Sequence, residues 1–342
     1  MRKSVKIWLI VAASLICAGA IILGGVVTMN GSWNITNLFK TQYEVNEYRV
    51  TDEFRDIVIK TSTADIEVVS SQSQDSSVIC HERENLRYEV TVTDGVLEIK
   101  LIDSRKWYEH ISFFSVDTAS VKLMLPAGEY GDLTVKNSTG DVSTVKEHSF
   151  EKIDISVSTG DIKNYASSKG DIEIKTTTGD VKNYASSEGK IKIKTETGDI
   201  TADGVSAESV ELSVDTGRIK ANGLTCQKEL RVTVDTGKCE LVRVSCGELT
   251  SKGNTGDISM TSLISEGRID IERDTGDVRF EDCDAVSVEI STETGDVKGS
   301  FLTDKVVYAD TDTGRVEIPR CKSGGICEIT TDTGDIKISI KK

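Results

Sequence analysis

The sequence predicts an all-β protein, a parallel β-solenoid of 19–20-residue coils that follows an N-terminal transmembrane helix. Three observations support this fold class. A Thr-Gly pair occurs eleven times at intervals of 19 or 20 residues, apolar residues alternate on both sides of each pair, and residues 7–29 form an uncharged, largely apolar run. Repeats of about 20 residues are typical of solenoids, in which each unit buries its apolar face only by stacking on its neighbours.

The repeat defines one coil. The glycines of the eleven pairs are Gly140, Gly160, Gly179, Gly198, Gly217, Gly237, Gly256, Gly276, Gly295, Gly314 and Gly334. The second residue after each glycine is never polar, and the residues seven, five and three positions before it form sets such as Ile153, Ile155 and Val157. This alternation indicates a strand with one buried face. Each coil is therefore expected to contain a strand, a bend at Thr-Gly, a second short strand and a return.

The Thr-Gly bend has two expected properties. Glycine tolerates the unusual φ angle that such a corner requires. The threonine should point inward by parity with the apolar positions and form an internal ladder of hydroxyl groups. The alternative is a surface threonine array of the ice-binding kind, which needs a flat Thr-x-Thr face. We favour the internal ladder, because the residue three positions before glycine is Val157, Gly253 or Arg273 in some coils.

The N-terminal segment is typical of a membrane anchor. Residues 7–29 carry no charge and are long enough to cross a bilayer core of about 30 Å. Residues 1–6 hold three basic residues and the next basic residue is Lys40, so the positive-inside rule places the N-terminus in the cytoplasm. The alternative is a cleaved signal peptide with small residues at 18–20, past which the apolar run continues. We expect a single-pass cell-membrane protein with an extracytoplasmic solenoid.

The remaining chain divides into three segments. Residues 30–44 form a polar linker, residues 45–136 an N-terminal β cap with irregular first coils, and residues 137–342 the regular repeats. Within the cap, Asp94-Gly95 lies between two alternating segments and predicts a hairpin with a type I′ turn. At the other end, Lys341-Lys342 would follow the last strand and discourage pairing at the open edge.

The composition limits the partners of the protein. The net charge is −15, and such a chain would be repelled by nucleic-acid phosphates. The acidic solenoid suits cations or a basic partner surface, and the expected partners are the membrane, through the N-terminal helix, and cell-wall polymers or another envelope protein.

The repeat also resembles a known bacterial family. The resembling segments are Phe54–Ile57, Thr63–Ile66, Leu125-Pro126 and the Thr-Gly-Asp run that begins at Ser138, and together they cover roughly residues 50–342. The family is a domain of unknown function labelled "putative adhesin", and Lia-operon-type envelope proteins are among its members. The resemblance implies a right-handed β-solenoid on Gram-positive-type cell envelopes, with a poorly defined biochemical role.

A row of carboxylates is the strongest candidate for chemistry. The residue after glycine is aspartate in eight coils: Asp141, Asp161, Asp180, Asp199, Asp257, Asp277, Asp296 and Asp335. Stacked oxygens of this kind suit Ca²⁺. The alternative is that these carboxylates satisfy turn amides, and that Arg218, Lys238 and Arg315 are balanced by the acids Asp215, Asp235 and Asp312 of their own corners. We favour the turn interpretation and expect no cofactor, with Ca²⁺ as the weaker alternative.

Cysteines and one irregular coil supply further candidates. Cys226 and Cys246 occupy the same coil position 20 residues apart, within disulfide range if the coils stack. Three other cysteines fall at inward positions and are expected in the core: Cys239, Cys283 and Cys321. Gly253 and Arg273 occupy positions in adjacent coils that are aliphatic or threonine elsewhere, and Gly253 would leave room for the arginine stem. The alternatives are a binding spot and a tolerated packing defect, and we favour the packing defect.

Catalytic motifs are missing from the sequence. It contains no nucleophile elbow, phosphate-binding loop or zinc-protease motif, so we predict no catalytic residues. The expected function is a cell-envelope adhesion or interaction scaffold, or a scaffold for envelope stress. The alternatives are a carbohydrate-active enzyme of the polysaccharide lyase type on a β-helix and a cation-binding structural rod.

Overall fold

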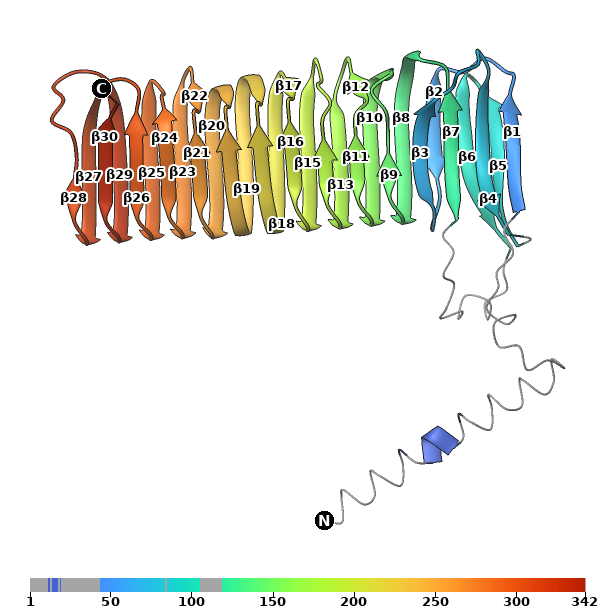
Figure 1. Cartoon of the computed structure of the whole chain (residues 1–342), viewed down its shortest axis with the longest axis horizontal. Coiled ribbons are helices and arrows are strands. Elements are labelled where there is room, and N and C mark those ends of the chain that lie inside the picture. Colours follow the sequence, from blue (N-terminus) through green and yellow to red (C-terminus); the bar gives the residue numbers. More distant parts are fainter. Residues whose placement is uncertain are drawn as a thin grey trace. The chain divides into compact units, whose positions relative to one another are not determined.

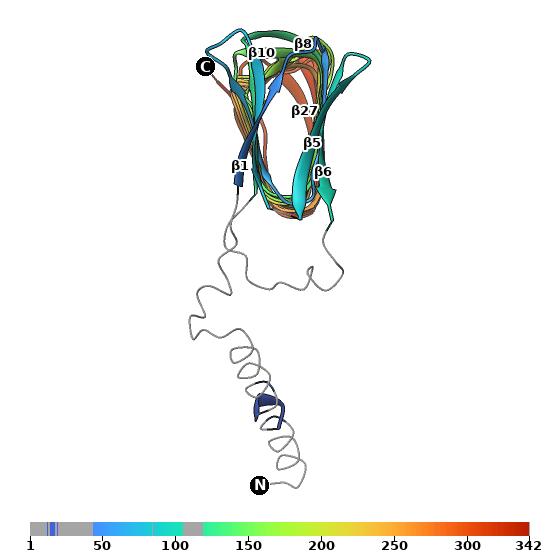
Figure 2. The same cartoon turned by 90° about the vertical axis from the view of Figure 1, so that its right-hand side faces the viewer.

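The computed structural model describes residues 12, 14–17, 19, 44–83, 85–104 and 119–341. Strands from residue 44 onward form a single stack of coils along one axis (Figure 1). Viewed along that axis, the coils superpose into a flattened ring with two long faces (Figure 2). The prediction of an all-β solenoid with coils of about 20 residues is confirmed. Most of the predicted span 7–29 lies outside the described residues, among which no helix is long and apolar enough to cross a bilayer.

The first long face contains the strands that precede the Thr-Gly pairs. In spatial order it consists of β5 (Leu86–Thr93), β6 (Val96–Asp103), β2 (Asp56–Lys60), β8 (Gly128–Thr139), β10 (His148–Thr159), β13 (Ile172–Thr178), β15 (Lys190–Thr197), β18 (Ser209–Asn222), β19 (Thr225–Val242), β20 (Ser245–Thr255), β23 (Arg268–Thr275), β25 (Ser287–Thr294), β29 (Gly325–Thr333) and β27 (Lys305–Thr313). All neighbours are parallel except β5 and β6.

The second long face contains the strands that follow the pairs. Its order is β1 (Glu44–Val50), β4 (Ser76–Glu82), β7 (Ser120–Leu125), β3 (Asp65–Ser70), β9 (Val142–Ser143), β11 (Ile162–Asn164), β14 (Val181–Asn183), β16 (Ile200–Asp203), the ends of β18 and β19, β21 (Ile258–Thr261), β24 (Val278–Cys283), β26 (Val297–Phe301), β30 (Ile336–Ile340) and β28 (Val316–Glu317). The short strands β12 (Ser167–Ser168), β17 (Ser206–Ala207) and β22 (Ile264–Ser265) lie on the return.

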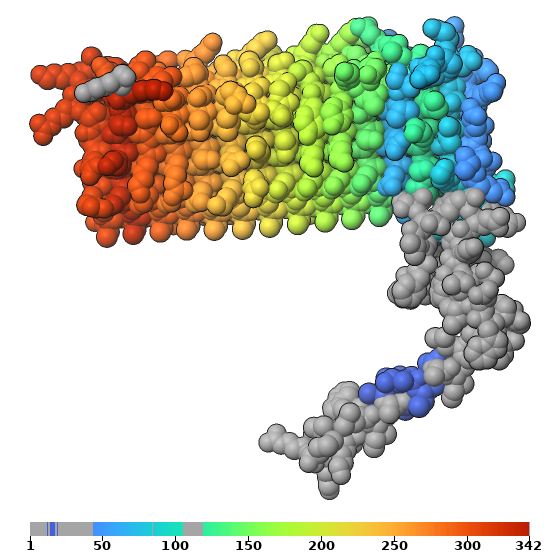
Figure 3. Space-filling view, viewed as in Figure 1, coloured from blue at the N-terminus to red at the C-terminus, as the bar shows by residue number. Residues whose placement is uncertain are grey.

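Apolar side chains from both faces fill the interior. The second residue after the corner glycine is buried in every coil except the one that contains Val316, which is 42% exposed. Stacking therefore provides the burial that a coil of about 20 residues cannot provide alone. Figure 3 shows the sequence colours from green to red as bands along the stack, whereas blue, cyan and green mix at the N-terminal end, where the strands do not stack in sequence order.

Glycine is required at the corners for two reasons. Gly160 has a φ of 151°, and a Cβ there would lie 2.1 Å from the carbonyl oxygen of Gly140 in the coil below. That region of φ is rarely adopted by other residues, and the coils approach too closely for a side chain. The Gly160 amide instead donates to the carbonyl of Thr178 in the next coil at 2.9 Å. The predicted role of the corner glycine is confirmed.

The N-terminal end is closed by antiparallel strands. The β5–β6 hairpin turns at Asp94 and Gly95, whose φ angles are 51° and 77°, as the predicted type I′ turn requires. Strand β4 pairs antiparallel with both β1 and β7. The cap therefore departs from the parallel stacking of the coils.

The C-terminal end differs from the prediction. Strands β29 and β30 insert between the β25–β26 coil and the β27–β28 coil, so the outermost coil is the penultimate one in sequence (Figure 1). Lys341 consequently follows an interior strand and forms an ion pair with Asp282. The expectation that Lys341-Lys342 would protect the open edge is wrong, because the local repeat does not specify the order of the last two coils.

Candidate functional site

The corner edge of the solenoid differs from the predicted arrangement in the direction of its threonines. Inward alternation ends three residues before glycine, and the chain then turns, so that the next two residues both remain outside. All eleven corner threonines are exposed: Thr139, Thr159, Thr178, Thr197, Thr216, Thr236, Thr255, Thr275, Thr294, Thr313 and Thr333. The prediction of an internal ladder at this position is wrong.

Internal hydroxyl groups exist two positions earlier. Thr176 and Thr195, three residues before their glycines, are buried and donate to the carbonyls of Gly160 and Gly179 at 3.3 and 3.1 Å. Thr292 and Thr331 donate to corner glycines in the same way. These bonds satisfy corner carbonyls from inside the coil.

The exposed threonines form one continuous row. Each is the register partner of the threonine in the neighbouring coil, from Thr139 through Thr294 to Thr333 and Thr313. Adjacent strands are spaced about 4.8 Å apart, so the hydroxyl groups repeat at that interval. None of these side chains has a hydrogen-bond partner within the described part of the chain. The row is therefore available to an external ligand.

The corner aspartates bond to backbone amides of the next coil. Oδ1 of Asp141 accepts from the Asp161 amide at 2.8 Å, and Asp161 and Asp180 continue the pattern at the same distance. Asp199, Asp257, Asp277 and Asp296 likewise each accept from the corner amide above. Each corner aspartate thus accepts a hydrogen bond from a corner amide of the neighbouring coil, not from an amide of its own corner.

A metal role for these aspartates has little geometric support. One oxygen of each bonding carboxylate is already used by an amide, and the described residues contain no cluster of three or more His, Cys, Asp or Glu able to hold a metal. Near the C-terminal end, Lys298 and the Asp335 amide lower the pKa of Asp296, and Arg315 lowers that of Asp335. Both interactions favour the charged carboxylate.

The basic replacements are balanced between coils. Arg315 pairs with Asp335 at 2.7 Å, and Lys238 approaches Asp257 to 3.5 Å, each in a neighbouring coil. Asp215 approaches Lys194 of an adjacent coil, at 3.9 Å. The expected pairing across a single corner is therefore replaced by pairing along the stack for Lys238 and Arg315, while Arg218 forms no ion pair within the described part of the chain.

The cysteines are free thiols. Cys226 and Cys246 are register partners with buried side chains, and whether they can be oxidised to a disulfide remains a prediction. Cys239 and Cys283 lie in the core, and burial raises the pKa of Cys239 to about 12. Cys321 is only half-buried in the loop after β28, so its assignment to the core is wrong. Pro319 and its neighbours leave the coil there, which removes the inward position.

Gly253 and Arg273 are register partners on β20 and β23. Arg273 is 3% exposed, and its guanidinium donates to Ser251 Oγ at 2.8 Å and to the Glu272 carbonyl at 3.1 Å. A Cβ at position 253 would lie 2.7 Å from Nη1 of the arginine. Burial lowers the pKa of Arg273. This side chain occupies the interior and is not presented to a ligand.

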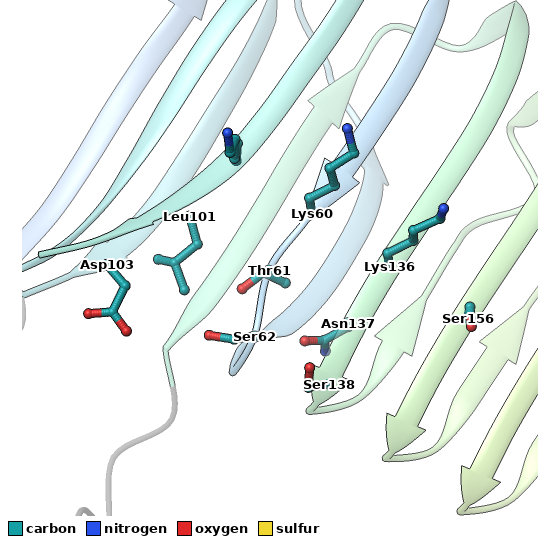
Figure 4. Close-up of a pocket in the computed structure, with 10 residues that line it drawn as sticks. Lys60, Thr61, Ser62, Leu101, Asp103, Lys136, Asn137, Ser138 and Ser156 are labelled. Atoms are coloured by element: carbon teal, nitrogen blue, oxygen red, sulfur yellow. The ribbon is translucent and has the colours of Figure 1, made fainter. Parts of the chain in front are cut away.

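A feature that the sequence analysis missed lies on the first face near the cap. Lys60, Lys100 and Lys136 are register neighbours on β2, β6 and β8. They line a shallow hollow of about 470 Å³ together with Ser62 and Ser138, among others. Figure 4 shows Lys60 and Lys136 on neighbouring strands with their amino groups on the same side. No local motif predicts this cluster, because Lys60 and Lys136 are far apart in sequence.

The family can be assigned from the repeats and the first coils. Residues 54–252 and 242–342 match the family described as Toastrack DUF4097. The chain belongs to this family. The resemblance predicted from the Thr-Gly-Asp repeat is confirmed. The solenoid is the structure of the part of the chain that matches this family.

Several solved structures are similar to the chain. A protein of Bacteroides fragilis described as a "putative adhesin" is 15% identical over 88% of this chain and 99% of its own, with a TM-score of 0.33. A "putative adhesin" of Parabacteroides distasonis is 12% identical over 84% and 98%, with a TM-score of 0.41. A "putative lipid binding protein" of the same organism is 16% identical over 86% and 97%, with a TM-score of 0.36. No curated protein matches the chain.

Proposed function

We propose that this Toastrack protein is a membrane-anchored, extracytoplasmic scaffold for adhesion or envelope interactions, and that it is not an enzyme. The observation that carries the proposal is the row of exposed corner threonines. A rigid, regular array of hydroxyl groups suits contact with an extended ligand or surface, because many weak contacts act together. A single catalytic centre gains nothing from such repetition.

The proposal includes the anchor and the winding of the coils. The uncharged run 7–29 and the basic residues within 1–6 support a single crossing with the solenoid outside. Right-handed winding is implied by the resemblance to the family. Protease treatment of intact cells tests the topology: the solenoid epitope should be lost, whereas an epitope placed at residue 1 should survive until the cells are lysed.

The enzyme alternative requires a basic residue beside carboxylates in a groove. Among the described residues, Arg273 and Lys305 are buried, and Lys305 forms an ion pair with Asp284. Neither side chain is free to accept a proton from a polymer. One hollow does place exposed lysines beside a carboxylate, so the alternative has to be tested there. It is the hollow lined by Lys60, Lys100, Lys136 and Asp103. An assay for unsaturated uronates released from acidic glycans tests this point, and turnover by the purified full chain would refute the scaffold proposal.

The threonine row is tested by removing its hydroxyl groups without changing the shape of the side chains. In the variant T178V/T197V/T216V, β-propensity and volume are kept. Cells that display this variant should be retained several-fold less on an envelope-coated surface than cells with the unchanged chain. The matched control is T134V/T201V/T233V, which removes three outward threonine hydroxyls away from the corner. Equal retention by all three chains would contradict a role for the row.

A further inference from the structure

A row of lysines crosses the N-terminal coils on the first face. In register order it contains Lys100, Lys60, Lys136, Lys175 and Lys194, with Ser156 between Lys136 and Lys175. The six positions span about 24 Å at about 4.8 Å per strand. We call these five lysines the lysine row. It is unexpected on a chain whose net charge is −15.

The amino groups of the lysine row are accessible. Lys100 and Lys136 form no ion pair within the described segments, while Lys60 lies 2.8 Å from Glu98, Lys175 lies 2.5 Å from Glu173 and Lys194 lies 3.9 Å from Asp215. The three paired lysines have about half of their side chains exposed, at 49%, 49% and 45%. Surface pairs of this kind contribute about 0–1 kcal/mol, so a competing anion can replace the carboxylate.

The border of the row changes character along the solenoid. Two residues before the corner glycine, or at the equivalent position of the first coil, the first coils carry hydroxyl groups: Ser62, Ser138, Ser158 and Thr177. Later coils carry mostly acids there: Glu196, Asp215, Asp235, Asp274, Glu293, Asp312 and Asp332. On this side the lysine row therefore has hydroxyl neighbours in the first coils and acids in the later ones. On its other side Lys60 and Lys175 pair with Glu98 and Glu173, and Lys100 is the register partner of Glu89 on β5.

The hollow beside the row is also lined by hydroxyl groups. Ser62 and Ser138 line it and are exposed. Asn137 lies beneath them, is 6% exposed and donates through Nδ2 to the Ala64 carbonyl at 2.8 Å, so it supports the floor of the hollow. A ligand that carries both negative charges and hydroxyl groups would satisfy the lysines and the serine hydroxyls together.

We propose that the lysine row binds a linear anionic polysaccharide. The row is one residue wide and several coils long, which matches a chain with regularly spaced charges. A planar anionic membrane fits less well, because it would also approach the acids that flank the row, Glu98 and Glu173 as well as those from Glu196 onward. The inference deepens the proposed function by naming a ligand class for the same extracytoplasmic solenoid.

The test uses the full chain in neutral detergent and polygalacturonate as the probe. The variant K60Q/K100Q/K136Q should lower the affinity roughly tenfold, because three exposed charge contacts are lost. The variant K60R/K100R/K136R should retain binding. The matched control K163Q/K182Q/K220Q removes three lysines from the second face and should change the affinity less than about twofold. Binding by the unchanged chain should weaken as salt rises.

Four outcomes would overturn the inference. Three concern binding: no binding by the unchanged chain, equal losses in the two glutamine variants, and binding to phosphatidylglycerol vesicles that depends on the row while polygalacturonate does not bind. Melting curves establish that each variant is folded. The fourth outcome concerns adhesion. If K60Q/K100Q/K136Q retained full adhesion in the display experiment, the polysaccharide inference would fail while the scaffold function would stand.

Discussion

The two ends of the solenoid terminate the stack in different ways. At the N-terminal end, strands β1, β4 and β5 pair antiparallel with their neighbours and close the interior. At the C-terminal end, β27 and β28 pair on one side only within the described chain, so the outermost coil keeps a parallel edge. Its interior positions are correspondingly less buried, with Val316 42% exposed.

The difference shows what stops a solenoid. A parallel coil presents the same donors and acceptors as the coil below it, and thus a template for another strand. Antiparallel strands break that template. The N-terminal cap also contains Glu82, which is 1% exposed and accepts hydrogen bonds from Asn46, Tyr48 and the Tyr88 amide at 2.6, 2.8 and 2.8 Å. The cap thus has antiparallel pairing and a hydrogen-bond network of its own. The outermost C-terminal coil keeps the pairing pattern of the other coils, but on one side only within the described chain.

The largest expected loss of stability comes from replacing a corner glycine by alanine. We compare this substitution in a middle coil and in the outermost C-terminal coil. Gly160→Ala should lower the free energy of unfolding by about 3 kcal/mol, since it combines backbone strain with a Cβ 2.1 Å from a carbonyl oxygen of a packed coil. Gly314→Ala should cost about 1 kcal/mol. Gly314 does not have the positive φ of Gly160, and the outermost coil can shift to relieve the 2.0 Å contact of a Cβ with the Gly334 carbonyl oxygen. Urea unfolding measures both. Equal losses would show that the end coil is as rigid as the middle.

The next effect concerns the cap. Glu82→Gln should lower the free energy of unfolding by about 2 kcal/mol. The two carboxylate oxygens of Glu82 now accept hydrogen bonds from buried donors, and glutamine offers only one acceptor oxygen in their place. The control is Glu89→Gln, an exposed position on β5, which should be neutral within about 0.5 kcal/mol. Thermal melts of the full chain measure both. A neutral Glu82→Gln would mean that the cap does not depend on this network.

Alkaline pH should weaken the cap. Burial and the hydrogen bond to Glu82 raise the pKa of Tyr48 to about 12, above its usual value of 10.0. The stability linked to this phenol is therefore fully present below pH 10 and is lost as the pH rises through about 12. Melting temperatures across that window should fall less for Tyr48→Phe than for the unchanged chain. Parallel curves for the two proteins would contradict the linkage.

The smallest effect on stability is expected at the outer edge. Val316→Lys should change the free energy of unfolding by less than about 0.5 kcal/mol, because the side chain is exposed. The same change at Val297, which is 0% exposed at the equivalent position, should cost several times more. The lysine introduced at the edge would also oppose strand pairing, so sedimentation at high concentration should show less association than for the unchanged chain. More association by the variant would contradict this interpretation of the edge.

The candidate surface was only partly predictable from the sequence. The alternation of inward and outward residues predicted that the corner threonines point inward. In the structure, the two residues before each corner glycine both point outward, because the alternation does not continue through a bend. Asp141 and the other corner aspartates were correctly identified as partners of turn amides. Their partner is the amide of the next coil, which no single repeat can reveal.

The sequence by itself determined the coil. Its 19–20-residue period, alternating aliphatic residues and corner glycines describe local geometry that each repeat carries in its own residues. The tertiary structure decided the order of the coils at both ends and thereby the neighbours of every surface residue. Lys60 meets Lys100 and Lys136 only because β2 lies between β6 and β8. Parallel coils with the same pattern can stack in more than one order, so the choice depends on how the ends close.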